Sequence, residues 1–272
     1  MARSLWTGSL SFGLVNVPVA LYSGVIDTDL HFRQLHAKDH TPIEMHRFCS
    51  KEDKEVPLEE IAHGAKTDDG KQVVLTDEEL ATAAPRRTRT IDIEAFVDLE
   101  DVDPIYFDHP YVLLPLGDAE GTKRAYRLLL EVMERTERAA LGRFVLRTKE
   151  YLVLIEVRSG RLTLTTMRFH DEVRPTKDVP KPGKAAKPAK KELDQAVALI
   201  EALSCDWDPS RYEDEYTKRL KKVLRRKQKG QTVKAPEREA EPSPVPDLMA
   251  ALERTLEEVQ SGDRPTPAGA AR

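Results

Sequence analysis

The sequence has few cysteines, no long apolar run and no signal-peptide pattern, and each absence narrows the class of protein. Its two cysteines, Cys49 and Cys205, are too few and too far apart for a disulfide framework or a cysteine-rich zinc site. No stretch approaches the roughly 18 apolar residues of a membrane-spanning helix, and the N-terminus alternates polar with apolar residues. We therefore expect a cytoplasmic protein with free thiols and no membrane contact.

Sequence patterns of catalysis are also missing. The chain has no glycine-rich phosphate loop, no H-E-x-x-H pair and no nucleophile elbow. One group of metal-binding residue types has a spacing that fits no standard zinc site. It consists of His31, His36, His40, His46 and Cys49. We predict no catalytic residue, no metal and no cofactor.

A second group of charged residues faintly resembles a metal-dependent nuclease, although solvated acids are the simpler interpretation. It consists of Asp101, Asp103, Asp108, Glu156 and Arg158. Such nucleases usually have a lysine where this chain has the arginine. A nuclease acting on DNA ends therefore remains a rival hypothesis.

Charge is strongly segregated along a chain whose formal net charge is only −4. Residues 91–120 carry nine acidic and no basic side chains, whereas residues 123–149 carry eight basic ones. Residues 181–191 contain five lysines, residues 218–229 contain eight basic residues, and neither block contains an acid. Any one block is most simply a solvated face, but several together favour a polyanionic partner.

Alternation of apolar and polar residues predicts short strands in the first two thirds of the chain. The clearest pattern covers residues 4–23, where Pro18 favours an edge strand or a bulge because proline has no N–H donor. Ser159 and Gly160 mark a hairpin turn. Further strands are predicted at residues 72–75, 89–97, 111–114, 142–148, 151–157 and 161–169. Many short strands with non-helical connections favour an antiparallel barrel or sandwich, mainly β with some helix.

Helices interrupt this pattern at three places. The first is predicted at residues 57–63, and the second at residues 76–80, where Thr76 and Glu79 form a capping box. The third covers residues 122–140, with apolar positions at helical spacing and arginines on the opposite face.

After residue 178 the composition changes. Prolines among lysines predict a semi-rigid linker at residues 179–191, followed by two amphipathic helices within residues 192–230. The first has an apolar stripe of Leu193, Val197, Ile200 and Leu203. Residues 231–272 are predicted to form a flexible tail with a short amphipathic helix at residues 246–260.

The second of these helices is predicted to begin at Asp208 and Pro209 and to end near Gly230. Its apolar stripe either packs on the core or binds a partner protein. The stripe consists of Tyr212, Tyr216, Leu220 and Val223. The basic residues of the same helix are predicted to form an auxiliary DNA contact. They are Lys218, Arg219, Lys221, Lys222, Arg225 and Arg226.

The strand-rich part supplies the main candidates for binding nucleic acid. They are Arg33, Lys38, Arg47, Arg86, Arg87, Arg89, Arg147 and Lys149. The group at residues 86–89 lies where a loop runs into a strand, so that its guanidinium groups reach successive phosphates. No interleaved aromatic platform and no helix-turn-helix pattern accompany these residues. The sequence therefore predicts a protein that grips the duplex backbone without reading base sequence.

The chain resembles the bacterial Ku family in several strings of residues. They are RSLWTGSLSFGLVNVPVALYS, FRQLHAKD, TIDIEAFVDLEDVDPIYFDHPYVLLP, LGRFVLRTKEYLVLIEV and LTLTTMRFHDEVRP. The resemblance covers about residues 3–175, continues more loosely over residues 211–230 and gives no pattern for residues 231–272. One departure is HGAK at residues 63–66, where the family commonly has a Gly-Tyr pair, so any contact of that tyrosine is absent here.

The resemblance implies a Ku-type β-barrel core with an extended bridge, in which two copies form a ring around duplex DNA. It implies binding and not catalysis: loading onto the ends of broken double-stranded DNA at the nucleoid, and recruitment and stimulation of an ATP-dependent DNA ligase D in non-homologous end joining. Residues 1–178 would be the DNA-binding and dimerising core, and residues 192–230 the partner-binding region. Besides the nuclease, the remaining rival is an adaptor that never touches DNA.

Overall fold

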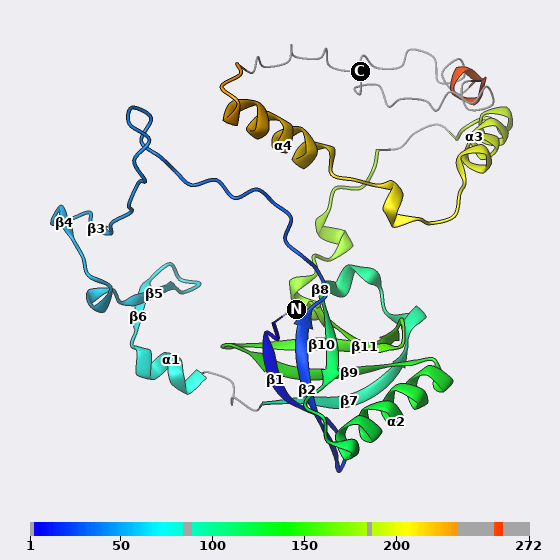
Figure 1. Cartoon of the computed structure of the whole chain (residues 1–272), viewed down its shortest axis with the longest axis horizontal. Helices are drawn as coiled ribbons and strands as arrows, with labels where there is room; N and C mark the ends of the chain where they lie inside the picture. The colour runs from blue at the N-terminus through cyan, green and yellow to red at the C-terminus, as the bar shows by residue number, and fades with distance from the viewer. Residues whose placement is uncertain (1–2, 84–88, 184–186, 233–252, 258–272) are drawn as a thin grey trace. The chain divides into compact units, whose positions relative to one another are not determined.

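The computed structural model describes residues 3–83, 89–183, 187–232 and 253–257. The chain divides into two compact units, residues 1–179 and 180–272 (Figure 1). The division falls within the segment where prolines alternate with lysines.

The first unit is built on a closed barrel with the strand order β1-β2-β8-β11-β10-β9-β7. Each pair of neighbours is antiparallel except β1 and β7, which run parallel and close the barrel. The strands are β1 Trp6–Phe12, β2 Val15–Ser23, β7 Thr90–Asp98, β8 Phe107–Pro115, β9 Arg138–Leu146, β10 Lys149–Arg158 and β11 Arg161–Met167. The predicted barrel is thereby confirmed, and closure leaves none of these seven strands as a free edge.

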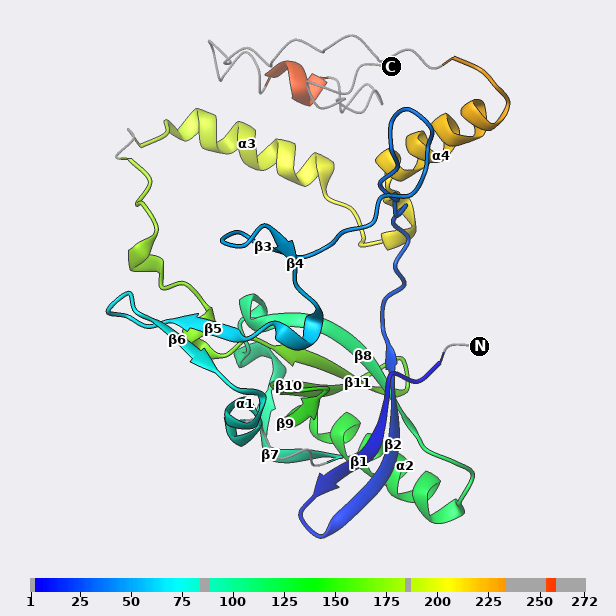
Figure 2. The ribbon, with the colours of Figure 1, turned by 90° about the vertical axis from the view of Figure 1, so that its left-hand side faces the viewer.

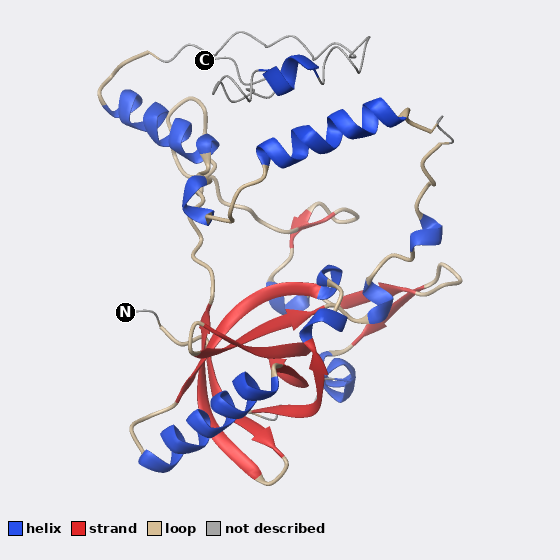
Figure 3. Ribbon diagram, turned by 90° about the vertical axis from the view of Figure 1, so that its right-hand side faces the viewer, coloured by secondary structure: helices blue, strands red, loops and turns tan. Residues whose placement is uncertain are grey.

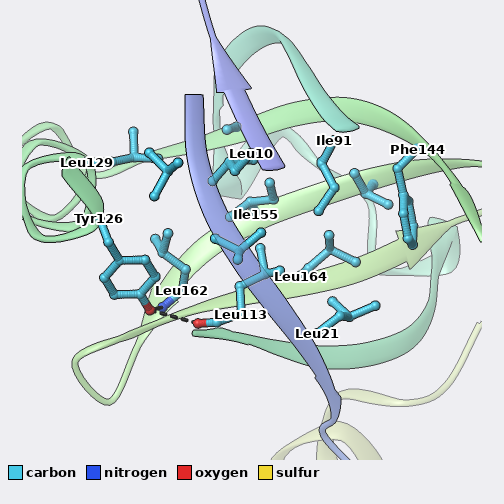
Figure 4. Packing of buried hydrophobic residues seen from close by; sticks show 14 of the residues in the cluster. Leu10, Leu21, Ile91, Leu113, Tyr126, Leu129, Phe144, Ile155, Leu162 and Leu164 are labelled. Atoms are coloured by element: carbon cyan, nitrogen blue, oxygen red, sulfur yellow. Dashed lines mark hydrogen bonds between the residues drawn. The ribbon is translucent and has the colours of Figure 1, made fainter. Parts of the chain in front are cut away.

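The core lies inside the barrel because alternate residues of every strand point inward. Leu10, Leu21, Ile91 and Leu164 are completely buried and come from four different strands (Figure 4). A smaller cluster around Leu154 lies on the outer face, where the 3-10 turns η2 Leu99–Asp101 and η3 Pro104–Tyr106 cover the sheet.

Helix α2 (Glu120–Thr136) lies against the barrel at the end where β8 finishes and β9 begins (Figure 3). The side chains of Tyr126, Leu129 and Met133 join the barrel core. The predicted helix ran on to residue 140, which is wrong. Glu137 takes a left-handed conformation with φ of 54° and ends the helix, so the next residues are strand.

Two local predictions in the barrel have different outcomes. The hairpin at Ser159 and Gly160 is confirmed, because both residues have positive φ and join directly paired strand ends. The expectation that Pro18 marks an edge or a bulge is wrong. Its strand has neighbours on both sides, and Pro18 is tolerated because the pairing of β2 with β8 begins only at Val19. The Pro18 carbonyl still accepts a hydrogen bond from the Leu116 N–H at 2.9 Å.

Residues 24–89, here called the arm, form a long insertion between β2 and β7 (Figure 2). The arm contains β3 Phe48–Cys49, β4 Lys54–Glu55, η1 Leu58–Glu60, β5 His63–Lys66, β6 Gln72–Leu75 and α1 Asp77–Ala83. The predicted helix at residues 57–63 is only the single turn η1. The capping box is confirmed: the Glu79 N–H donates to Thr76 Oγ1 at 3.2 Å and the Thr76 N–H donates to Glu79 Oε2 at 2.9 Å.

The second unit contains α3 (Lys190–Leu203), the turn η6 (Pro209–Arg211) and α4 (Glu215–Gln228). The turns η4 (His170–Glu172) and η5 (Thr176–Asp178) precede it. The predicted helix from Asp208 to Gly230 is split: Asp208 caps only η6, and the longer helix begins after a second cap at Asp214. Of the predicted tail helix, residues 253–257 are helical, while its remaining positions lie outside the described residues.

Candidate nucleic-acid interface

Barrel closure gathers three of the predicted basic residues at one end. The arm leaves the barrel after Ser23 and returns at Arg89, at the end of the barrel opposite α2. The tight turn between β9 and β10 lies at this same end and carries Arg147 and Lys149. We call this set of Arg89, Arg147 and Lys149 the basic rim.

The three members of the basic rim differ in how far their charge is neutralised. Lys149 Nζ lies 3.5 Å from Glu172 Oε1 and 5.2 Å from the centroid of the Tyr151 ring. The pKa of Glu172 is lowered by a hydrogen bond from the Phe169 N–H and, to a lesser degree, by the charge of Lys149. Arg147 is exposed, has a positive φ of 61° and lies within ion-pair distance of no carboxylate in the described residues. Arg89 is likewise exposed and lies within ion-pair distance of no described carboxylate, so the charges of both arginines are left for an anionic group.

Aromatic rings lie directly beneath the basic rim. Trp6 packs edge-on against Phe144 with a centroid distance of 5.7 Å, and Phe144 lies 6.0 Å from Tyr151. His109 and Tyr111 form another pair at 4.8 Å, and burial raises the pKa of Tyr111. Trp6, Phe144 and Tyr151 come from three different strands, so sequence spacing gave no sign of their packing, whereas His109 and Tyr111 are two residues apart on β8. Phe144 is buried and the other rings are half-buried, so they do not form an exposed base-stacking platform.

The arm carries three more of the predicted residues: Arg33, Lys38 and Arg47 are all exposed. Nearby histidines are engaged with carboxylates, such as His31 with Asp27 at 3.0 Å. His36 contacts Asp39 at 2.9 Å and His46 contacts Glu55 at 2.5 Å. A hydrogen bond to Glu55 raises the pKa of His46. Arg86 and Arg87 lie outside the described residues.

The auxiliary set on α4 is divided by the structure. Lys218 pairs with Glu213, and with Glu215 at 3.0 Å, while Arg219 Nε donates to the Glu215 carbonyl at 3.2 Å. The remaining members are exposed and lie within ion-pair distance of no carboxylate in the described residues. They are Lys221, Lys222, Arg225 and Arg226.

The predicted apolar stripe is also revised. Tyr212 is not on α4 at all, because that helix begins at Glu215. Tyr216 is exposed, whereas Leu220 and Val223 are half-buried.

The residues that resembled a nuclease do not form a metal site. Asp103 accepts the Ile105 N–H, Asp108 pairs with Arg168 at 3.1 Å, and the Glu156 carboxylate pairs with its neighbouring arginine at 2.6 Å. Within the described ranges, no group of three or more His, Cys, Asp or Glu side chains is placed to hold a metal. No helix in the described part of the chain is long and apolar enough to cross a membrane.

The described part of the first unit is thus of the closed-barrel class, with a long insertion and a basic rim at the end where the insertion begins. The sequence model of the Ku70/Ku80 beta-barrel domain matches residues 11–195. The chain is 42% identical over 261 residues to "Non-homologous end joining protein Ku 1" of Geotalea uraniireducens, covering 95% of this chain and 98% of that protein. It is 35% identical over 270 residues to "Non-homologous end joining protein Ku" of Bacillus subtilis, covering 98% and 86% respectively.

The chain therefore belongs to the Ku family of non-homologous end joining proteins, which are DNA-binding repair proteins and not enzymes. The resemblance seen in the sequence is confirmed. Among solved structures, the SPOC domain of human PHD-finger protein 3 aligns with a TM-score of only 0.30 and 10% identity, covering 61% of this chain and 95% of that one.

Proposed function

We propose that two copies of this chain form a ring that binds the ends of double-stranded DNA without reading sequence. In this proposal the ring also recruits and stimulates an ATP-dependent DNA ligase D. The observation that carries the proposal is the arm, which leaves the barrel beside the basic rim and whose described residues are mostly exposed.

The arm supports dimerisation because it lacks a core of its own. No described residue of the arm is buried, and it exposes many large apolar side chains. These are Val25, Ile26, Phe32, Leu35, Ile43, Met45, Phe48, Leu58, Ile61, Val73, Val74 and Leu80. Exposed apolar surface on this scale marks an interaction site, and in a symmetric dimer each arm is covered by the other copy.

Charge supports a DNA channel lined by only part of the arm. Residues 24–51 carry four acidic and four basic side chains, whereas residues 52–83 carry ten acidic and three basic ones. The more basic half, with Arg33, Lys38 and Arg47, is therefore the one we place toward the phosphates, together with the basic rim and residues 86–87. The acidic half faces outward.

The ligase proposal concerns the second unit. Residues 192–230 present Tyr212 and Tyr216, and α4 also carries Leu220 and Val223. Amphipathic helices of this kind bind grooves on partner proteins. Lys221, Lys222, Arg225 and Arg226 of α4 would meanwhile hold DNA as a tethered second contact.

The test compares labelled linear duplex with the same duplex covalently closed, in the presence of magnesium. We expect a shifted band and intact DNA only with the linear form, because a closed ring enters duplex DNA only at an end. Equal binding to closed DNA would contradict the ring. Degraded DNA would indicate a nuclease, and no shift at all would indicate an adaptor.

Salt dependence locates the channel lining. Each neutralised phosphate contributes about 0.9 to the slope of log K against log salt concentration. Replacing Arg86, Arg87 and Arg89 together by alanine should lower that slope and weaken binding to all sequences alike. An unchanged slope would indicate that Arg147 and Lys149 line the channel instead. The variant with both of these residues replaced by alanine is the matched comparison.

A further inference from the structure

Two exposed aromatic rings stack on each other in the segment between α3 and α4. The rings of Trp207 and Tyr212 have a centroid distance of 5.4 Å and an interplanar angle of 25°. Both rings remain in contact with solvent, with 78% of Trp207 and 66% of Tyr212 exposed. Tyr216, the second residue of α4, is 68% exposed. A cluster of exposed aromatic side chains is costly in water, so it indicates a surface that is covered in a complex.

Local hydrogen bonds hold the stack in place. Asp208 Oδ1 accepts the Ser210 N–H at 3.0 Å and the Ser210 hydroxyl at 2.7 Å, and Pro209 opens the turn. The Tyr212 N–H then donates to the Pro209 carbonyl at 3.2 Å. This turn reverses the chain between the two rings, so the platform is preformed and little conformational entropy is lost when it is bound.

The charge around the stack decides between a nucleic acid and a protein as its occupant. Residues 206–216 contain five acidic side chains and a single basic one, Arg211. Exposed aromatic rings that stack on unpaired bases are normally accompanied by basic groups that hold the phosphates. Here the carboxylates would repel phosphates. The basic residues that suit DNA begin only later, along α4.

We infer that residues 206–216 are an acidic aromatic docking segment, which inserts Trp207 and Tyr212 into an apolar pocket rimmed by lysine or arginine on the ligase. This inference rests on the proposed recruitment of a ligase and specifies where it happens. The two functions of the second unit then lie on different segments: the segment before α4 binds protein, and the basic residues of α4 bind DNA.

Tryptophan and tyrosine are the side chains that most often dominate binding energy at protein interfaces. Replacing either Trp207 or Tyr212 by alanine in the full chain should therefore raise the Kd for purified ligase D about 30-fold or more. Trp207→Phe is the matched control, because it keeps an aromatic ring and should restore most of the affinity. Asp206→Lys should weaken binding as well, and that loss should shrink at high salt.

Fluorescence gives a readout independent of joining activity. The chain has two tryptophans, and Trp6 is packed against Phe144 in the barrel. Quenching of tryptophan fluorescence by acrylamide should therefore report mainly on Trp207. Adding ligase without DNA should reduce this quenching. The four variants should bind linear duplex as the unmodified chain does.

The outcomes separate this inference from the function on which it rests. If the unmodified chain neither binds nor stimulates the ligase, the proposed recruitment fails. If it does both and Trp207→Ala and Tyr212→Ala bind equally well, recruitment stands and the docking segment is overturned. Protection of Trp207 by single-stranded DNA alone would also overturn the inference, because the stack would then be a platform for bases.

Discussion

One phenolic hydroxyl ties α2 to the barrel. Tyr126 donates its hydroxyl hydrogen to the Leu113 carbonyl at 2.8 Å and accepts the Leu162 N–H at 3.0 Å (Figure 4). Leu113 and Leu162 are direct partners on β8 and β11, so the hydroxyl joins both strands to the helix that follows β8. Burial raises the pKa of Tyr126, which keeps the hydroxyl protonated and able to donate.

Tyr126→Phe should destabilise the barrel by roughly 1–3 kcal/mol, because the Leu113 carbonyl and the Leu162 N–H lose a buried partner. Urea unfolding at fixed protein concentration measures this change. Tyr106→Phe is the matched control, since its hydroxyl makes only an exposed contact of 3.4 Å with His170. If the two variants lost the same stability, the buried hydrogen bonds would not be the cause.

Residue-level predictions succeeded where the partner is close in sequence. The capping box of Thr76 and Glu79 joins residues three apart, so its pattern is visible in the sequence. The partners of Tyr126 are 13 and 36 residues away, and Glu172 is distant from Lys149. Such contacts depend on the strand order, which no local pattern encodes.

At the scale of elements, the alternation of apolar and polar residues predicted the barrel strands to within a few residues. The ends of the helices were predicted less accurately. Residues 139–140 are alanines, which suit a helix, and they were placed at its end. Both are buried in β9, so burial in the barrel overrides their helix preference. The break before α4 was missed because Tyr212 and Tyr216 have helical spacing, although Asp214 offers a second cap.

The start of α4 should be sensitive to acid. Asp214 Oδ1 accepts the Thr217 N–H at 3.0 Å. The pKa of Asp214 is lowered, first by a side-chain and then by a backbone hydrogen bond with Thr217. Because the pKa is depressed in the helix, this stabilisation is present above the unfolded pKa of about 3.9 and is lost as the pH falls through the folded value.

Circular dichroism of a peptide spanning residues 205–232 at low temperature measures this effect. Asp214→Ala should lower helicity at pH 7 and reduce the acid-induced loss. Asp214→Asn is the matched control, because asparagine caps a helix without titrating. It should keep helicity at pH 7 and lose less of it in acid than the unmodified peptide. Identical acid curves for the three peptides would contradict a role for this cap.

For the whole molecule, the sequence predicted the barrel but not which residues meet at each of its two ends. The basic rim joins residues 89 and 147–149 because β7, β9 and β10 are adjacent in a closed barrel. That adjacency follows from the order of seven strands, and the charge pattern alone could not supply it. Residue patterns alone did not reveal the arm as a unit, because most of residues 24–89 lacks strong periodicity and no described residue there is buried; the extended bridge was implied only by the family resemblance.

The division into two units predicts that binding and recruitment are separable. A chain ending at Val179 retains the barrel, the basic rim and the arm, so it should remain a dimer and bind linear duplex. It lacks the docking segment and α4, so it should not stimulate the ligase. A chain ending at Thr232 keeps both and should stimulate joining as the full chain does. Light scattering, band shift and ligation assays on the two truncated chains measure these properties.

Full stimulation by the shorter chain would place the ligase contact on the barrel or the arm. Failure of the shorter chain to fold would show that the second unit completes the core.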